Sequence, residues 1–255
     1  MGYAFDVIGS KDKAVAIIDS KIENEKQVAQ DIMKQHKNVK SVLKKKSGRT
    51  GVYRIYSLKL VAGSRDTEVI HKEHGCFLKL DPKKVYFSPR ESTERKRIAE
   101  KVKPKDSVLV MFSGIGPYAI TIAKKHPKAN IVAIEINLDA VIYAEKNIKL
   151  NKIKNIKNYC WDVREARYLG KFDRIIMPLP ETAIEFLDSA FLSSKKGTVI
   201  HLYGISNEPK KFSDLRKKVK EMAKTFNIKY KIISDQKVLP YAPKMWKVRL
   251  DIKIL

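Results

Sequence analysis

The sequence predicts an α/β fold in two parts: a smaller α+β domain over residues 1–87 and a larger domain over residues 88–255. Three observations support this prediction. The chain has 255 residues, of which 44% are hydrophobic, enough to bury two cores. Its first third holds short alternating segments and one amphipathic segment. From Ser107 onward, apolar strands alternate with helical segments, which is the order that builds a mostly parallel sheet.

The first domain is expected to be rich in strands, with one helix. Val15–Ile18 is a short apolar run that predicts a strand. Residues 26–36 carry apolar side chains three and four positions apart, which predicts an amphipathic helix. Residues 52–60 alternate in a way that suits a half-buried strand. Further strands are expected at residues 68–71, 76–80 and 85–87.

The boundary between the two domains is placed at Ser88. The segment Ser88–Glu91 combines a capping serine, a proline at the first helical position and a glutamate three residues after the cap. Together these residues predict the start of a helix. The helix is expected to reach about Val102 and to end near Pro104, because proline cannot continue it.

Strand and helix patterns alternate through the second domain. The expected strands are residues 107–112, 131–136, 172–177, 198–203 and 246–255, with one more ending before Asp162. The expected helices are residues 118–125, 138–150 and 182–192, and a basic helix at residues 210–225. In such a sheet the ligand lies beyond the carboxyl ends of the strands, where the strand order switches.

Among the bulk properties of the sequence, the net charge of +25 is the most informative about the binding partner of this protein. With 53 Lys and Arg against 28 Asp and Glu, the surface attracts polyanions, and nucleic acid is the favoured partner. An anionic membrane surface is a weaker candidate, because no basic amphipathic helix carries a bulky aromatic face. A high growth temperature also enriches lysine, but usually with matching glutamates, which are missing here.

Signals for export, membrane insertion and metal binding are not found in the sequence. No apolar run approaches the roughly 20 residues of a membrane span, and the first residues do not form a secretory signal. Cys76 and Cys160 stand far apart, with no partners at metal-ligand spacing. We therefore expect a cytoplasmic protein with two reduced thiols and no metal.

A glycine-rich turn follows the first strand of the second domain. Gly114 and Gly116 let the backbone approach a ligand closely, and the following helix presents its positive N-terminus. Glu135, at the end of the next strand, can accept hydrogen bonds from both hydroxyls of a ribose. The spacing of Gly114, Gly116 and Ala119 also satisfies the dinucleotide fingerprint, so the turn alone fits a nicotinamide enzyme as well.

Two later features distinguish between these cofactors. Asp162 follows the expected third strand and can accept a hydrogen bond from an adenine amino group, although it could also cap a helix. Pro178-Leu179-Pro180 ends the fourth strand in a stiff turn, of the type that adenine and RNA base methyltransferases press against the target base. A nicotinamide enzyme does not require this turn. The two features favour a methyltransferase that uses S-adenosylmethionine and acts on RNA.

The sequence resembles the archaeal and eukaryotic tRNA guanosine-37 N1-methyltransferases over nearly its whole length. The segments that carry the resemblance are Phe5–Ser10, His71–Phe77, Asp81–Arg90, Ser92–Arg95, Phe112–Tyr118, Asn147–Asn151 and Asp162–Glu165. The resemblance implies a Rossmann-like class I methyltransferase domain with S-adenosyl-L-methionine as its cofactor. It also implies that a monomer acts on position 37 in the anticodon loop of a tRNA.

Three departures from the family pattern refine this expectation. The chain starts at the family's middle domain, so the domain that some members use against the tRNA elbow is expected to be missing. Val110 replaces an aspartate, so Glu135 and Asp162 are expected to hold the cofactor without that carboxylate. Pro178 replaces the asparagine of the N1-only enzymes and offers a guanine edge no donor. The bifunctional archaeal branch, which methylates N1 of guanosine 37 and C7 of 4-demethylwyosine, resembles this sequence in having that proline.

The predicted function is therefore the bifunctional one. An N1-only methyltransferase is the alternative if Pro178 is incidental. An aminocarboxypropyl transferase of the same family is a weaker alternative, because it lacks the Pro-x-Pro turn. A catalytically silent RNA-binding protein with this fold is also an alternative, since Val110 and Lys72 depart from the family pattern.

The resemblance also assigns cofactor contacts to single residues. Ser88 and Arg95 are expected near the amino-acid end of the cofactor, although Ser88 could also only cap its helix. Glu135 and Ile136 are expected at the ribose and adenine. The full set expected to bind the cofactor is Ser88, Arg95, Phe112, Gly114, Gly116, Glu135, Ile136 and Asp162.

Three further residues are expected to act on the target base. Asp106 aligns with a catalytic glutamate and is the expected general base for the guanine N1 proton. Lys72 aligns with an arginine that contacts the purine O6, but a lysine lacks the arginine fork. Pro178 is expected to form a wall against the base. Residues 210–224 and the lysines around Lys44 are expected to contact the tRNA backbone, although charged runs are usually solvated faces.

Overall fold

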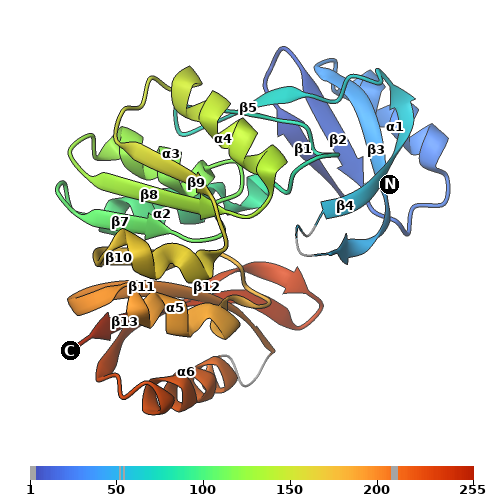
Figure 1. The fold of residues 1–255 in the computed structure, drawn as a ribbon. Coiled ribbons are helices and arrows are strands. Elements are labelled where there is room, and N and C mark those ends of the chain that lie inside the picture. The colour runs from blue at the N-terminus through green and yellow to red at the C-terminus, as the bar shows by residue number, and fades with distance from the viewer. Residues whose placement is uncertain (1–3, 52, 54, 208–211) are drawn as a thin grey trace. The chain divides into compact units, whose positions relative to one another are not determined.

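The computed structural model describes residues 4–51, 53, 55–207 and 212–255, and its contacts divide the chain into two units (Figure 1). Unit 1 comprises Met1–Ser92, Gly114–Pro117 and Asn137–Lys152. Unit 2 comprises Thr93–Ser113, Tyr118–Ile136 and Ile153–Leu255. The division differs from the predicted boundary at Ser88, because two segments of the predicted second domain group with unit 1.

Unit 1 contains a four-stranded sheet in the order β1-β2-β3-β4. Its elements are β1 (Phe5–Gly9), β2 (Ala14–Ile18), α1 (Glu25–Gln35), β3 (Val39–Thr50) and β4 (Ile55–Gly63). β2 and β3 are parallel, with α1 as the crossover, and the outer pairs are antiparallel. Val28, Ala29 and Ile32 pack against the strands, so the apolar spacing predicted for this helix forms its buried face.

A two-stranded ribbon and a helix complete unit 1. These elements are β5 (Val69–Glu73), β6 (Cys76–Leu80), the short turn η1 (Pro89–Glu91) and α4 (Leu138–Leu150). Side-chain amides of α4 bond to the backbone of β6: Asn147 Nδ2 donates to Lys79 O at 3.1 Å, and Asn151 Nδ2 donates to Phe77 O at 2.6 Å. These bonds explain why α4 groups with the N-terminal unit.

Unit 2 is built on a seven-stranded sheet in the order β12-β13-β11-β10-β7-β8-β9. The strands are β7 (Ser107–Val110), β8 (Asn130–Glu135), β9 (Ile156–Cys160), β10 (Phe172–Met177), β11 (Ser194–Asn207), β12 (Tyr230–Ala242) and β13 (Met245–Ile254). The strands from β11 to β9 are parallel, and β13 lies antiparallel between β11 and β12. This arrangement confirms the predicted Rossmann-like class I architecture.

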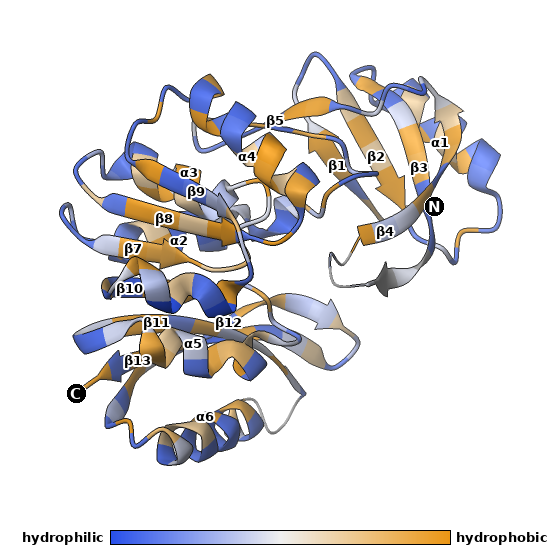
Figure 2. Cartoon of the chain, viewed as in Figure 1, coloured by the Kyte–Doolittle hydropathy of each residue, from blue (hydrophilic) through white to orange (hydrophobic). Residues whose placement is uncertain are grey.

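Helices bury both faces of this sheet. They are α2 (Ser92–Lys101), α3 (Pro117–Lys125), η2 (Val163–Leu169), η3 (Ala183–Phe186), α5 (Leu187–Leu192) and α6 (Ser213–Thr225). Val108 and Val110 pack with residues of α2 and α3, whereas Leu109 packs with residues of α5 and α6. Burial on both sides explains the nearly continuous apolar runs of the central strands, such as β8 in Figure 2.

A buried ionic network links α2 to β11 and β13. Arg249 is 1% exposed; its guanidinium bonds to Glu94 and donates from Nε to Asp251 Oδ1 at 2.7 Å. Tyr203 donates to Glu94 at 2.8 Å, and His201 Nδ1 lies 2.6 Å from Asp251 Oδ1. Each carboxylate therefore has more than one partner, as buried charges require.

Most predicted elements form within a few residues of their expected bounds, with two exceptions. Residues 85–87 do not form a strand, because the N–H groups of Lys84 and Val85 bond to Asp81 O in a turn. The predicted helix at residues 182–192 is a 3-10 turn followed by the short α5. β1, β3 and β12 were not predicted. Residues 52, 54, 210 and 211 of two predicted elements lie outside the described residues.

Candidate functional site

The carboxyl ends of four parallel strands meet along one edge of the sheet of unit 2. The predicted site residues on this edge are Phe112 after β7, Glu135 and Ile136 at the end of β8, Asp162 after β9 and Pro178 after β10 (Figure 1). Backbone bonds continue past the strands, from Ser113 N–H to Ile134 O at 2.9 Å and from Trp161 N–H to Glu135 O at 3.1 Å. The structure thus brings these five predicted residues together.

The backbone leaves β7 in a strained conformation. Phe112 has a φ of 54°, a left-handed value that costs a non-glycine residue about 1–2 kcal/mol. Its ring packs edge-on against Phe186, with the centroids 5.2 Å apart. Ser113 follows with 4% exposure, and its Oγ has no hydrogen-bond partner among the described residues. Strain next to a polar atom without a partner is typical of a ligand site.

The glycine turn itself belongs to unit 1. Gly114 and Gly116 have φ values of 55° and 84°, so both positions favour glycine. Asn147 Nδ2 donates to the carbonyl of Ile115 at 3.1 Å and fixes the turn from α4. A Cβ atom on Gly114 would approach no atom more closely than Tyr86 O at 4.0 Å. The turn is therefore open on that side, where a ligand could approach the backbone.

The end of β8 offers a carboxylate followed by an exposed apolar side chain. Glu135 is half-buried, and Ile136 is 41% exposed. Cys160 stands opposite Glu135 in the strand register and is an exposed free thiol. A carboxylate can accept the hydroxyls of a ribose, and an apolar side chain beside it can cover one face of a base.

Asp162 caps η2 and is held by an arginine. One oxygen accepts a hydrogen bond from the Arg164 N–H at 2.9 Å, and the other lies 2.7 Å from the Arg164 guanidinium. That guanidinium stacks over the Phe186 ring at 4.7 Å from its centroid. Capping and ligand binding are compatible, because a carboxylate accepts several hydrogen bonds. Arg164 and Phe186 thus connect Asp162 to Phe112, and sequence reasoning assigned neither of them a role.

Pro178 follows β10, the neighbour of β7 in the sheet. It is half-buried, and Ala183 N–H donates to Leu179 O at 2.8 Å to close the Pro-x-Pro turn. Glu181, directly after the turn, accepts a hydrogen bond from the Tyr241 hydroxyl. Tyr241 lies on β12, a strand that the sequence did not predict, so this contact could not have been anticipated. The turn is fixed from both sides.

Asp106 does not reach this edge. It precedes β7, where its Oδ2 accepts from Lys103 N–H at 3.0 Å and lies 3.3 Å from Arg174 Nε. At about 3.3 Å per strand residue, β7 separates Asp106 from Phe112 by roughly 15–20 Å. The expectation that Asp106 is the general base does not fit its position, because it stands at the amino ends of the strands.

Ser88 and Arg95 fall in different units. Ser88 precedes η1 with an extended backbone, and its side chain makes no capping hydrogen bond, so the predicted serine cap is not formed. Arg95 lies on α2 and is 2% exposed. A charge buried this deeply needs a partner, which distinguishes Arg95 from the solvated basic residues of the same helix.

Lys72 lies on β5 in unit 1. Its side chain is exposed, and its ammonium lies 5.4 Å from the centroid of the Phe77 ring on β6. Phe77 is 37% exposed and pairs with Lys72 across the ribbon. The predicted base contact is therefore one half of a cation–π pair on the surface of the ribbon.

The two basic segments that were predicted to contact the tRNA backbone differ in whether their charges are paired within the protein. Lys44 donates to Ile22 O at 2.6 Å and lies 3.0 Å from Glu25, so its charge is neutralised within unit 1. The basic helix begins at Ser213, and its exposed residues include Lys217 and Lys218. The helix presents the solvated basic face that its sequence predicts.

These features fit S-adenosylmethionine, a cofactor with an adenosine and an amino-acid end. In unit 1 the turn at Gly114 is open beside the backbone, and in unit 2 Ser113 Oγ has no partner among the described residues. Glu135 and Asp162 supply the acceptors that a ribose and an adenine amino group need. No helix in the described part of the chain is long and apolar enough to cross a membrane.

Comparison with known proteins agrees with this reading. The sequence pattern of the TRM5/TYW2 methyltransferase domain matches residues 69–233. The chain is 40% identical to the tRNA (guanine(37)-N(1))-methyltransferase Trm5b of Pyrococcus abyssi, over 98% of this chain and 74% of the relative. It is 32% identical to the tRNA (guanine(37)-N(1))/4-demethylwyosine(37)-methyltransferase Taw22 of Nanoarchaeum equitans, over 99% of this chain and 100% of the relative.

A solved structure extends the comparison to a bound cofactor. The crystal structure of M. jannaschii TYW2 in complex with AdoMet superimposes with a TM-score of 0.74 at 30% identity, over 98% of this chain and 99% of that one. The sequence pattern covers more than half of this chain, and the relatives match along most of their length. The chain therefore belongs to the TRM5/TYW2 methyltransferase family of S-adenosylmethionine-dependent enzymes.

Proposed function

We propose that this enzyme methylates position 37 of tRNA-Phe at two stages, at N1 of guanosine and at C7 of 4-demethylwyosine. The observation that carries the proposal is Pro178, which stands at the carboxyl end of β10 where the N1-only enzymes have asparagine. Taw22, whose name includes both activities, matches this chain from end to end. The net charge of +25 suits a tRNA substrate.

The cofactor side of the site is assigned to the edge of β7, β8 and β9. S-adenosylmethionine supplies an electrophilic methyl group on a sulfonium, so most of the rate comes from holding the acceptor atom in line with it. The backbone of Gly114 and Gly116 approaches the ligand, and Glu135 accepts the ribose hydroxyls. Ile136 covers the adenine, and Asp162 accepts a hydrogen bond from its amino group.

The target base is assigned to the Pro178 turn. A proline wall offers no hydrogen bond to one particular purine edge, so it tolerates both guanine and the tricyclic base. Guanine N1 carries a proton that must leave. Glu181 is the carboxylate that follows the turn on this edge, whereas Asp106 lies at the opposite end of β7. We therefore assign proton acceptance to Glu181, positioned by the Tyr241 hydroxyl.

The test uses two forms of tRNA-Phe, one with guanosine and one with 4-demethylwyosine at position 37. Wild type and Pro178→Asn are incubated with labelled S-adenosylmethionine, and nucleoside mass spectrometry locates the added group. Wild type is expected to methylate both substrates. Pro178→Asn should keep its activity on guanosine and lose most of its activity on 4-demethylwyosine.

Other outcomes of this assay have defined meanings. Methyl on guanosine alone with the wild type would contradict the bifunctional proposal and leave an N1-only enzyme. Addition of a group heavier than methyl would indicate aminocarboxypropyl transfer. Binding of tRNA without transfer to either form would support the silent RNA-binding alternative and overturn the proposal.

A further inference from the structure

The segment between Asp31 and Asp66, which includes β3, β4 and the turn that joins them, carries a concentrated positive charge. No Asp or Glu occurs between Asp31 and Asp66, whereas ten Lys and Arg do. Some of these charges are neutralised: Lys45 lies 3.8 Å from Asp19, and Lys59 lies 2.6 Å from Glu25. Lys46, in contrast, is exposed and has no carboxylate partner among the described residues, so the segment favours an anionic partner over an apolar one.

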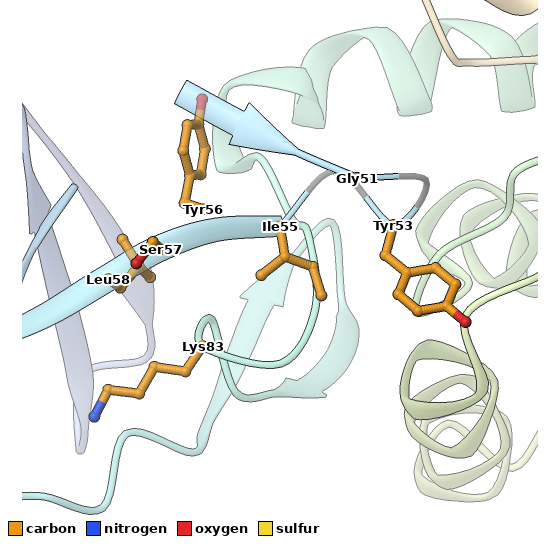
Figure 3. A pocket seen from close by; sticks show the side chains of 7 residues that line it. All are labelled: Gly51, Tyr53, Ile55, Tyr56, Ser57, Leu58 and Lys83. Atoms are coloured by element: carbon orange, nitrogen blue, oxygen red, sulfur yellow. The ribbon is translucent and has the colours of Figure 1, made fainter. Parts of the chain in front are cut away.

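A surface pocket lies beside this turn. It has a volume of about 440 Å³ and is lined by Gly51, Tyr53, Ile55, Tyr56, Ser57, Leu58 and Lys83 (Figure 3). In this view Ile55 lies between Tyr53 and Lys83, and Tyr56 projects to the other side of β4. The pocket thus joins an aromatic ring, an apolar side chain and a lysine from the loop after β6.

Tyr53 and Lys83 line the pocket with side chains whose polar ends have no partner among the described residues. Tyr53 is 51% exposed, and its hydroxyl makes no hydrogen bond within the described part of the chain. Lys83 is half-buried, and its ammonium has no carboxylate partner among the residues described. The Tyr56 ring, in contrast, is already covered by the Lys45 ammonium at 5.0 Å from its centroid. Tyr53 therefore presents a ring that makes no ring or cation contact among the described residues.

We propose that this pocket binds an unpaired nucleobase of the tRNA substrate, at a nucleotide other than the methylated one. In this proposal Tyr53 stacks on the base, Ile55 makes an apolar contact with the base, and Lys83 contacts the adjacent phosphate. An exposed aromatic ring next to lysines is how proteins hold single-stranded RNA without reading its sequence. The inference rests on the proposed function for the identity of the RNA.

The stacking part is tested by the affinity for an unmodified tRNA-Phe transcript, measured by fluorescence anisotropy. Tyr53→Leu removes the ring and should weaken binding by about 5- to 100-fold, the range that a stacked base provides. Tyr53→Phe keeps the ring and should restore wild-type affinity. The affinity for S-adenosylhomocysteine, which should be unchanged in both variants, shows that they are folded.

The phosphate part is tested by the salt dependence of the same affinity. Lys83→Gln should reduce the slope of log Kd against log salt by about 0.7–0.9, as for one phosphate contact. Lys26→Gln is the matched control, because Lys26 is an exposed lysine on α1 of the same unit and does not line the pocket. An equal effect of both substitutions would indicate diffuse attraction and overturn the assignment of Lys83.

The outcomes separate this inference from the proposed function. Wild-type affinity in Tyr53→Leu, with methyl transfer intact in the wild type, would overturn the inference and leave the function standing. Weaker tRNA binding by Tyr53→Leu, with no methyl transfer by the wild type, would support the pocket and reject the function. A weakened Tyr53→Phe variant would show that the hydroxyl acts rather than the ring, which would also overturn stacking.

Discussion

Substitution of Asp162 distinguishes its observed role as the cap of η2 from its proposed role as an acceptor for adenine. Asp162→Ala removes both, since alanine can neither accept the bond from the Arg164 N–H nor bind an amino group. Asp162→Ser keeps a capping oxygen, because serine is a good N-cap, but its short side chain does not extend to a ligand. The pair of variants therefore separates stability from cofactor affinity.

The magnitudes follow from the contacts. Loss of the cap should lower the free energy of unfolding by about 0.5–2 kcal/mol in Asp162→Ala. The ion pair to Arg164 adds little, because the Arg164 side chain is 63% exposed and such pairs contribute about 0–1 kcal/mol. A hydrogen bond to a charged acceptor contributes about 1.5–3 kcal/mol, so both variants should bind S-adenosylhomocysteine about 10- to 140-fold more weakly.

The assay combines urea unfolding with calorimetric titration of S-adenosylhomocysteine. Asp162→Ser should unfold close to the wild type and still lose affinity. Wild-type affinity in Asp162→Ser would refute the ligand role and leave Asp162 as a cap alone. A loss of affinity in Asp162→Ala only would show that the cofactor depends on η2 and not on the carboxylate.

Three further changes test the fold and the turn. Arg249→Met should lower the free energy of unfolding by about 3–5 kcal/mol, because two buried carboxylates lose their partner. Arg216→Met, which removes the surface pair with Asp235, should lower it by at most about 1 kcal/mol. Urea unfolding measures both values, and equal losses would contradict a stabilising role of the buried network. Burial raises the pKa of Asp173, but hydrogen bonds, first from Lys195, outweigh it and lower the pKa to about 2. The free energy of unfolding should therefore decrease as the pH falls from about 4 through 2, and this decrease should be smaller in Asp173→Asn. The same pH dependence in wild type and variant would contradict the prediction. Gly116→Ala should lower the free energy of unfolding by about 1–2 kcal/mol, because Gly116 has a positive φ, and should weaken the binding of S-adenosylhomocysteine. Wild-type values of both quantities would show that the turn tolerates a side chain.

The parallel core was predictable because its signals are local. Strands buried on both faces are continuous apolar runs in the sequence. After β7, a strand end, two glycines and a helix start follow one another within a few residues, and both glycines have the positive φ values that favour glycine. The same reasoning placed Glu135, Asp162 and Pro178 at strand ends, and the strand order brings them to one edge.

Features that depend on distant partners could not be predicted. β12 alternates weakly along its 13 residues and becomes a strand because it pairs with β13. Arg249 and Asp251 look like solvent-facing residues of a terminal strand, yet both are 1% exposed. Their burial is possible because Arg249 pairs with Glu94 and with Asp251, and His201 hydrogen-bonds to Asp251 from another strand. The sequence predicted that Asp106 precedes the first strand of the second domain, but only the sheet shows that it lies at the edge opposite Glu135, Asp162 and Pro178.

The central claim, methyl transfer to position 37 of a tRNA, is tested most directly by locating the product on two transcripts. Wild-type enzyme and labelled S-adenosylmethionine are incubated with a tRNA-Phe transcript carrying guanosine 37 and with one carrying adenosine 37. Nuclease digestion and mass spectrometry then assign the label to a nucleotide. The account predicts one methyl group on guanosine 37 and none on the adenosine transcript. No label on either transcript, or equal label at another position in both, would contradict it.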